Sequence, residues 1–361
     1  MLIARTPVRI SFAGGGTDLP SYYNRHGGVV LSTSINKYVY TILTAREDRL
    51  TQVISSDFRV TESYEDIAQH TFEGAELDIP LACLKFMTFR GGVNLFMASE
   101  IPAGTGLGSS GAVCVNLLKI LVAYLHLRWS KQDLAERAFQ IAREMLHKPV
   151  GKQDEYAAAF GGLNIFRFQE ERAGATPVRL PADVISTFEE SLMLFFTGTA
   201  RNSSDILTGQ DQQSAHGVPY VTEALHQQKA LVGPMAKALE KGDLDDFGDL
   251  LHHAWEVKRR LSPAISNPLI DEVYEAARSA GARGGKIAGA GGGGFLLLYC
   301  PPREQENVRQ ALGPFGLKEM FFGFDSHGSR VVYNDPFFDC DRRGGMRWLF
   351  REAGAAGAGG L

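Results

Sequence analysis

Residues 102–112 read Pro-Ala-Gly-Thr-Gly-Leu-Gly-Ser-Ser-Gly-Ala and lead directly into an apolar stretch, residues 113–127. Gly104, Gly106 and Gly108 alternate with other residues, so the backbone there can adopt positive φ angles and turn several N–H groups toward one anion. We therefore interpret this segment as a loop that binds a phosphate group.

A helix is expected to follow this loop. Ser109 and Ser110 are residue types that favour the N-terminal cap of a helix, and the apolar residues 113–127 are typical of a buried helix. The partial positive charge at the N-terminus of such a helix would face the same anion. Loop and helix together therefore predict one phosphate site.

Two better-known phosphate loops do not fit these residues. A Walker loop needs a Lys after its glycines, and none follows Gly108. The dinucleotide fingerprint is matched at Gly104 and Gly106 but has Ser109 in place of the third glycine, which also disfavours a Rossmann-type oxidoreductase. A glycine-rich loop that only turns the chain remains an alternative.

The composition is that of an ordinary globular protein with room for two domains, since 44% of the 361 residues are hydrophobic and 22% are charged. A net charge of −4 gives no overall attraction to nucleic acid or to an anionic membrane, so we expect neither as a partner. No apolar run is long enough for a membrane span, no secretory signal is recognisable, and the four cysteines lack metal-binding spacing. We expect a cytoplasmic protein with reduced thiols.

A second glycine-rich segment, residues 14–20, reads Gly-Gly-Gly-Thr-Asp-Leu-Pro and ends a strand pattern over residues 2–12. Asp18 would lie beside bare backbone, and Arg9, in the preceding strand, could reach the same cleft. The alternative is that Asp18 only caps a short helix that begins near Pro20.

Two acidic residues lie on either side of a break between two expected helices. Ser130 indicates the start of a helix that runs to about His147, with Glu144 near its end. Asp154 enters a second, short helix after a Pro and Gly break. The two carboxylates could converge on one divalent metal and one reacting hydroxyl, or both could be solvated surface charges.

The second half of the chain contains a third glycine-rich segment, residues 284–294, which precedes an apolar strand at residues 295–300. Because a strand and not a helix follows this loop, we expect its glycines to allow close approach to another element. The other elements expected in this half are a strand at residues 192–197 and helices at residues 220–241, 243–261 and 267–281.

Three motifs, at residues 6–18, 102–112 and 286–295, resemble in this order those of the GHMP kinase superfamily. The first motif does not have the Gly-Glu-His-Thr-Asp-Tyr form of galactokinases, and residues 151–157 read Gly-Lys-Gln-Asp-Glu-Tyr-Ala. This combination most resembles the bacterial D-glycero-D-manno-heptose 7-phosphate kinases, which phosphorylate the anomeric hydroxyl on the route to nucleotide-activated heptose.

The resemblance implies a two-domain α+β fold with the active site between the domains. Residues 1–185 would form an N-terminal domain like ribosomal protein S5 domain 2, which carries the ATP phosphate loop. Residues 186–340 would form a ferredoxin-like C-terminal domain, and residues 341–361 are expected to form a flexible tail.

The resemblance also implies roles for individual residues. Asp154 would be the catalytic carboxylate with Arg9 near the reacting centre, while Ser110 and Glu144 would hold Mg²⁺. The residues expected to bind the triphosphate of ATP are Pro102, Gly104, Thr105, Gly106, Leu107, Gly108, Ser109 and Ser110. The residues expected to bind the sugar are Gly16, Thr17 and Asp18.

These roles imply a kinase that transfers a phosphoryl group from ATP to the C1 hydroxyl of heptose 7-phosphate. The substrate's own phosphate needs a cationic pocket, for which Lys258 in the basic run 258–260 is a candidate, although a solvated helix face would also explain this run. The same motifs are compatible with a kinase resembling fucokinases, galactokinases or mevalonate kinases, and with a non-catalytic sugar-sensing protein of the same fold. The sequence leaves the oligomeric state open.

Overall fold

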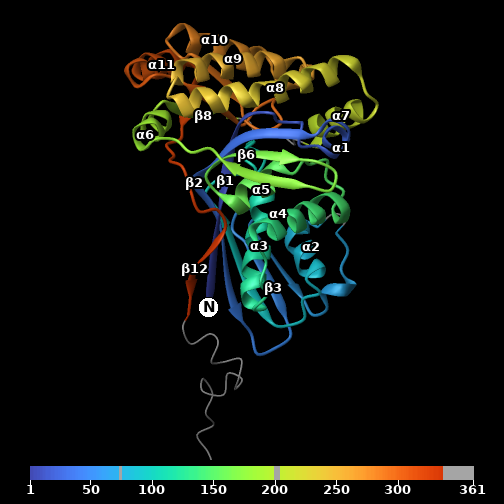
Figure 1. Ribbon diagram of the computed structural model, residues 1–361. Helices are drawn as coiled ribbons and strands as arrows, with labels where there is room; N and C mark the ends of the chain where they lie inside the picture. Colours follow the sequence, from blue (N-terminus) through green and yellow to red (C-terminus); the bar gives the residue numbers. More distant parts are fainter. Residues whose placement is uncertain (73–74, 199–203, 336–361) are drawn as a thin grey trace, which may run out of the picture.

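Two β-sheets form the framework of the protein, which is represented by a computed structural model that describes residues 1–72, 75–198 and 204–335 (Figure 1). The large sheet consists of β1 (Leu2–Ala13), β2 (Gly28–Ala45), β3 (Thr51–Ser55), β4 (Val60–Tyr64), β5 (Val93–Ser99), β6 (Leu163–Phe168), β7 (Ala173–Pro177) and β12 (Arg330–Asn334). The small sheet consists of β8 (Leu192–Phe196), β9 (Gly284–Ile287), β10 (Phe295–Tyr299) and β11 (Lys318–Glu319).

Helices pack against both sheets (Figure 1). The α-helices are α1 (Pro20–His26), α2 (Asp78–Phe86), α3 (Ser109–Tyr124), α4 (Lys131–Gln140), α5 (Gln153–Phe160), α6 (Ala182–Glu190), α7 (Ser204–Ala215), α8 (Pro219–Lys241), α9 (Leu244–Arg259), α10 (Pro268–Ser279) and α11 (Gln305–Leu312). A π-helical turn, η2 (Ile141–Met145), continues α4, and short 3-10 turns lie at Ile67–Gln69, Pro263–Ile265, Pro302–Glu304 and Gly313–Phe315. Within the described segments, no helix is both long enough and apolar enough to cross a membrane.

The large sheet is mostly antiparallel and follows the order β12-β1-β2-β5-β3-β4, with only β3 and β5 parallel among these neighbours. The long strand β2 pairs with β6 through residues 28–33 and with β5 through residues 39–45. The second half of β1 is buried along its whole length because α3 and α5 contact it as well as α8 and α9 (Figure 1). This burial places its polar side chains between two layers of helices.

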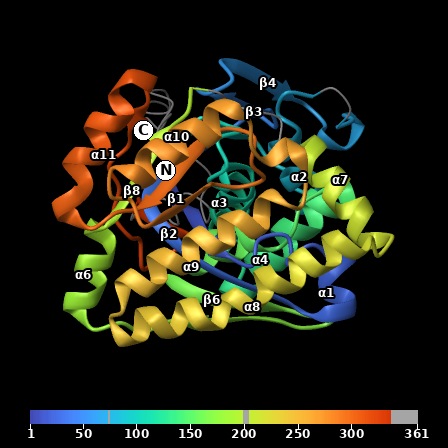
Figure 2. The same cartoon turned by 90° about the horizontal axis from the view of Figure 1, so that it is seen from above.

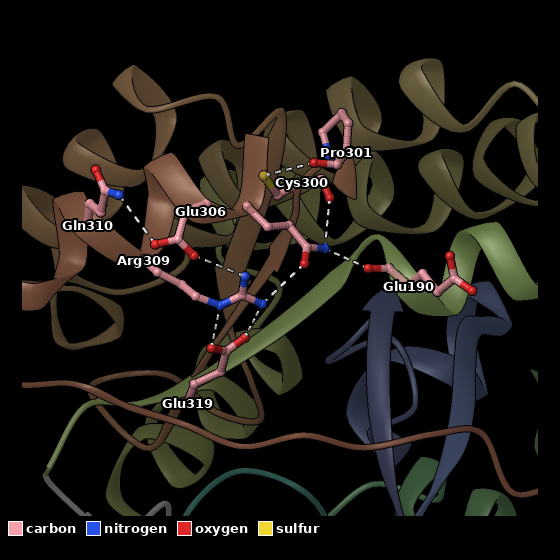
Figure 3. A network of polar contacts seen from close by, with 8 residues as sticks. Glu190, Cys300, Pro301, Glu306, Arg309, Gln310 and Glu319 are labelled. Atoms are coloured by element: carbon pink, nitrogen blue, oxygen red, sulfur yellow. Dashed lines mark hydrogen bonds and ion pairs between the residues drawn. The ribbon is translucent and has the colours of Figure 1, made fainter. Parts of the chain in front are cut away.

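The small sheet has the order β11-β8-β10-β9 and is antiparallel throughout. Helix α9 packs directly on β9, and a Cβ atom at Gly284 would come within 2.0 Å of the carbonyl oxygen of Gly248. The view from above shows α8, α9 and α10 side by side over this part of the molecule (Figure 2). At the edge of the sheet, the guanidinium group of Arg309 on α11 forms two hydrogen bonds, 2.8 and 3.0 Å, with the carboxylate of Glu319 on β11 (Figure 3).

Three aromatic rings connect the large sheet with helices α6 and α9 of the second half of the chain. Phe12 of β1, Phe188 of α6 and Phe247 of α9 are fully buried, and their ring centroids lie 4.8 to 5.6 Å apart. Aromatic contacts of this kind stabilise by more than the area that they bury. The two parts of the chain therefore share one core.

Several expected elements differ in detail. Helix α3 begins at Ser109, earlier than expected, and Gly108 occupies its N-cap position, so the two serines lie in the first turn and are not caps. The start of the third glycine-rich segment is strand β9 and not loop, because it pairs with β10.

The helices and strands do not test the expected division into domains at residues 185 and 186. The division after residue 185 falls inside α6, and β12, which we placed in the C-terminal domain, pairs with β1 of the large sheet. The domain limits therefore stay a prediction, and the expected tail at residues 341–361 lies outside the described residues. Cys83, Cys114 and Cys300 are buried free thiols, as expected.

Candidate active site

The phosphate loop has the backbone conformation that its glycines predict. The φ angles of Gly104, Gly106 and Gly108 are +74°, +86° and +76°, a region that residues with a Cβ rarely adopt. Because α3 starts at the next residue, Ser109, the free N–H groups of its first turn lie at the end of this loop. The loop and the helix together can therefore hold an anion.

The loop formed by residues 288–294 packs against the phosphate loop, as expected. A Cβ atom at Gly106 would lie 2.5 Å from the carbonyl oxygen of Ala288, and one at Gly294 would lie 2.4 Å from that of Thr105. The N–H of Phe295 also donates to the carbonyl oxygen of Thr105, at 3.2 Å. The glycines thus allow two backbones to touch, which fixes the shape of the phosphate loop.

Arg9 of β1 and Asp154 of α5 form a salt bridge beside the phosphate loop. The Nε and Nη2 atoms of Arg9 lie 2.8 and 2.6 Å from Oδ1 of Asp154. Nη1 of Arg9 donates to the carbonyl oxygen of Gly106 at 2.6 Å, and its backbone N–H donates to that of Leu107. Arg9 therefore connects the carboxylate to the loop, while the side chain of Asp154 stays 29% exposed.

Close packing holds Asp154 at this place. A Cβ atom at Gly108 would come 3.2 Å from Cγ of Asp154, and one at Gly111 would come 2.9 Å from its Cβ. Glycine at both positions therefore lets α5 approach the first turn of α3. A residue with a Cβ atom at position 108 or 111 would push the carboxylate of Asp154 away from the loop.

Asp18 is buried, and both of its carboxylate oxygens accept hydrogen bonds. Oδ1 accepts from the N–H of Gly16 at 2.9 Å and from Nε2 of Gln153 at 3.1 Å, and Oδ2 accepts from the backbone N–H of Gln153 at 3.2 Å. Burial and the negative charge of Asp154 raise the pKa of Asp18 to about 6. The helix-capping alternative is wrong, because Leu19 occupies the N-cap position of α1.

Two buried lysines, Lys258 and Lys286, lie near Arg9. Nζ of Lys258 donates to the carbonyl oxygens of Ile287 and Gly289, at 2.9 and 2.6 Å, and Nζ of Lys286 donates to that of Phe12 at 3.0 Å. Burial, with Lys286 and Arg9 nearby, lowers the pKa of Lys258 well below its usual value. Burial and Arg9 lower the pKa of Lys286 to about 7.

The solvated-face alternative is therefore wrong for Lys258, although it fits its neighbours. Arg259 pairs with Glu256 and Asp271, and Arg260 is exposed. Consecutive residues on a helix point in different directions, and only Lys258 points inward.

A cavity of about 320 Å³ connects all of these groups, because its lining includes Arg9, Asp18 and Asp154 together with Lys258 and Lys286. Four further polar side chains that line it have a buried atom with no hydrogen-bond partner among the described residues. These atoms are Ser11 Oγ, Gln153 Oε1, Glu155 Oε2 and Gln210 Nε2. Buried polar atoms without partners are costly, so this cavity is suited to a ligand that is rich in hydroxyl groups.

Two family models match the chain. The model described as GHMP kinases N terminal domain covers residues 77–162, and the one described as GHMP kinases C terminal covers residues 235–316. A D-glycero-alpha-D-manno-heptose 7-phosphate kinase of Campylobacter jejuni is 32% identical over 316 residues, which cover 85% of this chain and 92% of that protein. The chain belongs to the GHMP kinase family. The resemblance seen in the three sequence motifs is thereby confirmed.

Other relatives and solved structures agree with this assignment. An L-fucokinase/L-fucose-1-P guanylyltransferase of Bacteroides fragilis is 25% identical over 85% of this chain, which spans only 35% of that protein. A crystal structure of a D-glycero-D-manno-heptose 1-phosphate kinase from Bacteroides thetaiotaomicron shares 27% identity and a TM-score of 0.77, covering 93% of this chain and all of that one. A galactokinase of Lactococcus lactis, at 18% identity and a TM-score of 0.76, shares the fold. The two-domain GHMP kinase fold is therefore confirmed.

Within this GHMP kinase, most of the expected site residues line the cavity, and five do not. Those that line it are Arg9, Gly16, Asp18, Gly104, Gly106, Gly108, Ser109, Ser110, Asp154 and Lys258. Thr105 and Leu107 are fully buried and shape the loop from behind, and Pro102 is exposed. Thr17 is fully buried too, and its hydroxyl donates to the carbonyl oxygen of Gly14 at 2.7 Å, so it holds the loop and does not face a ligand.

The expectation that Glu144 lies at a metal site is wrong. Glu144 is exposed, and its carboxylate accepts a hydrogen bond from Gln140 at 2.9 Å. It lies in η2, where Leu146 N–H bonds to Ile141 C=O across five residues, so each turn is wider than in an α-helix. In this turn Ala142, and not Glu144, lines the cavity.

No cluster of three or more acidic, His or Cys side chains able to hold a metal occurs in the described part of the kinase. Mg²⁺ does not require such a cluster, because it is commonly held by one or two carboxylates together with phosphate oxygens and water. Lys286 and the four side chains with unpartnered atoms were missed by sequence analysis. Lys286 lies inside the third motif, but nothing in the sequence indicates that its side chain is buried.

Proposed function

We propose that this GHMP kinase transfers the γ-phosphoryl group of ATP to the C1 hydroxyl of D-glycero-D-manno-heptose 7-phosphate, which yields the 1,7-bisphosphate. The observation that carries this proposal is the Arg9–Asp154 pair, which lies beside the phosphate loop in a cavity that also contains Asp18. The names of the relatives at 32% and 27% identity support a heptose phosphate as the substrate.

The chain's own residues account for the binding of a nucleotide. Bound ATP would supply the transferred group, with Mg²⁺ to neutralise part of its charge. The glycines of the phosphate loop adopt positive φ angles, which can turn its backbone N–H groups toward an anion, and the first turn of α3 presents further N–H groups there. Ser110, which is exposed in the cavity lining, offers a hydroxyl oxygen near the same place.

Asp154 interacts with the C1 hydroxyl of the sugar that accepts the phosphoryl group. Its carboxylate either accepts the proton of the C1 hydroxyl or orients that hydroxyl, and the guanidinium group of Arg9 stabilises the ionised form at neutral pH. Asp18, held by three N–H groups, accepts a hydrogen bond from another hydroxyl of the sugar. Oε1 of Gln153 and Nε2 of Gln210 have no hydrogen-bond partner among the described residues, so they are free to bind further hydroxyl groups of the sugar.

Lys258 is our candidate for the phosphate that the sugar already carries. An ammonium group has three donors, and two of those of Lys258 go to carbonyl oxygens, so among the described residues one donor is left for a ligand. Lys286 lies nearby, and because its pKa is about 7 it adds a full positive charge to this part of the lining only at a lower pH.

Replacing Lys258 with Met tests this assignment. We expect KM for heptose 7-phosphate to rise about 10- to 100-fold, because a hydrogen bond to a charged group contributes about 1.5–3 kcal/mol. KM for heptose without the phosphate should not change, and Arg260→Met serves as the matched control on the same helix end. An equal rise in KM for both sugars would contradict the role of Lys258.

The experiment that tests the whole proposal is a panel of acceptors with ATP and Mg²⁺, read as release of ADP. The panel contains heptose 7-phosphate, heptose, fucose, galactose and mevalonate, and phosphorus NMR identifies the phosphorylated position. We expect heptose 7-phosphate to be preferred and C1 to carry the new phosphate. Preference for fucose, galactose or mevalonate would assign the kinase to another branch of the family, and no turnover with any acceptor would favour a sugar-sensing protein.

A further inference from the structure

The cavity of this kinase lacks the carboxylate that the metal site was expected to contain. Glu144 is exposed, and the residue of η2 that lines the cavity is Ala142, which has no ligand atom. If a protein carboxylate contacts the divalent cation that accompanies the nucleotide, it has to come from another residue.

Glu155 is the carboxylate that fits this place. It follows Asp154 in α5, lines the cavity and is only 2% exposed, and its Oε2 atom has no hydrogen-bond partner among the residues that the structure describes. A Cβ atom at Gly111 would lie 3.3 Å from its Cδ atom, so the carboxylate lies against the first turn of α3, which carries Ser110.

The cations on this side of the cavity are already paired with other carboxylates. The guanidinium group of Arg9 contacts Asp154, and Nζ of Lys148 lies 2.8 Å from Asp78. The two remaining lysines of the lining, Lys258 and Lys286, donate to backbone carbonyls near the loop of residues 288–294 and β1. Within the described ranges, Glu155 therefore forms no ion pair with a Lys or Arg side chain.

A buried carboxylate without a partner is costly unless it is neutralised or binds a cation. Mg²⁺ prefers oxygen ligands and commonly takes one or two carboxylates, with phosphate oxygens and water completing the octahedron. A carboxylate and a serine hydroxyl at the start of α3, beside the phosphate loop, offer such a partial set of ligands.

We propose that Glu155, together with Ser110, holds the divalent cation that accompanies the nucleotide, in place of the expected Glu144. This inference rests on the proposed function, because it needs a nucleotide in the phosphate loop. The carboxylate thus comes from α5, the helix that also carries Asp154.

The test measures the binding of Mn²⁺ to the full chain by electron paramagnetic resonance, with a saturating non-hydrolysable ATP analogue. In Glu155→Gln we expect the dissociation constant of Mn²⁺ to rise by about tenfold or more, since even indirect partners of a metal contribute that much. Binding of the analogue in the presence of EDTA should stay unchanged. Glu144→Gln is the matched control and should bind Mn²⁺ like the wild type.

Each outcome decides between the two proposals. Wild-type Mn²⁺ affinity in Glu155→Gln, or a loss in Glu144→Gln instead, overturns the role of Glu155 and leaves the proposed kinase function intact. No binding of the analogue to the wild type, with or without metal, overturns the proposed function itself. Glu155→Asp, which keeps the charge but withdraws it by one methylene group, provides a second variant in which Mn²⁺ affinity must also fall.

Discussion

Replacing Asp154 should affect the rate of phosphoryl transfer but not the binding of the nucleotide. In Asp154→Asn we expect kcat to fall by about 10²–10⁴-fold, because a neutral amide cannot take up the proton of the acceptor. The affinity for ATP should change little, since the phosphate loop is built from other residues. Steady-state rates and equilibrium binding of nucleotide check this, with the exposed Asp183→Asn as a control. Equal activity of the two variants would remove Asp154 from the mechanism.

The protonation of Asp18 should make KM for the sugar depend on pH. Its pKa in the folded protein is about 6, above the ordinary value of 3.8, so the carboxylate becomes protonated as the pH falls through 6. A protonated carboxyl group is a poorer acceptor, and we expect KM for the sugar to rise about tenfold per pH unit below 6 while KM for ATP responds less.

Asp18→Asn is the control for this pH profile, because the phosphate of the substrate also titrates near pH 6. The difference between wild type and variant isolates the contribution of Asp18. Identical profiles would show that the ionised form of Asp18 is not needed for binding the sugar.

At the scale of the elements, the contact between the phosphate loop and residues 288–294 depends on glycine. Ala at position 106 would have a φ of +86° and a Cβ atom 2.5 Å from the carbonyl oxygen of Ala288. We expect Gly106→Ala to lower the stability by about 1–3 kcal/mol or more and to weaken nucleotide binding strongly. Thermal unfolding and nucleotide titration measure both effects.

Gly209→Ala is the matched control for that substitution. Gly209 lies inside α7 with nothing within 4 Å of its Cβ position, so Ala there should raise helix stability by up to about 1 kcal/mol. If both variants kept the nucleotide affinity of the wild type, the close approach of the two loops would not matter for binding.

The structure of one element, η2, explains why Glu144 was wrongly expected at the metal site. Its position near the end of a helix, ten residues before Asp154, follows from the sequence, but the face on which it lies depends on the winding of that helix. The metal role of Glu144 was implied by the family resemblance and by its place near a helix end, and neither of these determines which face of the π-helical turn η2 carries its side chain.

At the scale of the whole molecule, the cavity joins both parts of the chain. Arg9 and Gly104 come from the large sheet and its loops, while Lys258 and Lys286 come from α9 and β9. The shared core of Phe12, Phe188 and Phe247 connects the same two parts. We therefore expect the molecule to unfold as one unit and to be stabilised as a whole by its ligands.

Calorimetry with ligand present tests this expectation. A ligand at 100 times its dissociation constant stabilises by about 2.7 kcal/mol, which in a chain of this length raises Tm by about 4 °C. The nucleotide analogue and heptose 7-phosphate should each shift a single transition. Two transitions, of which only one responds, would contradict the joint core.

Much of the fold follows from local sequence. Strands β1, β8 and β10 and helices α8, α9 and α10 lie within a few residues of their expected positions, because apolar spacing and turn residues define them locally. The partner of a strand does not follow in this way: β12 pairs with β1, more than 300 residues away in the chain.

The candidate site likewise has a part that follows from the sequence and a part that only the tertiary structure decides. The sequence by itself determined the phosphate loop, because its alternating glycines permit the positive φ angles that such a loop needs, and its motifs led to Arg9, Asp18 and Asp154. Only the tertiary structure decided which other side chains face the cavity: Lys286 and Glu155 inward, Glu144 and Thr17 away from it. Orientation depends on helix winding and on packing between distant segments, and neither of these is a property of the neighbouring residues alone.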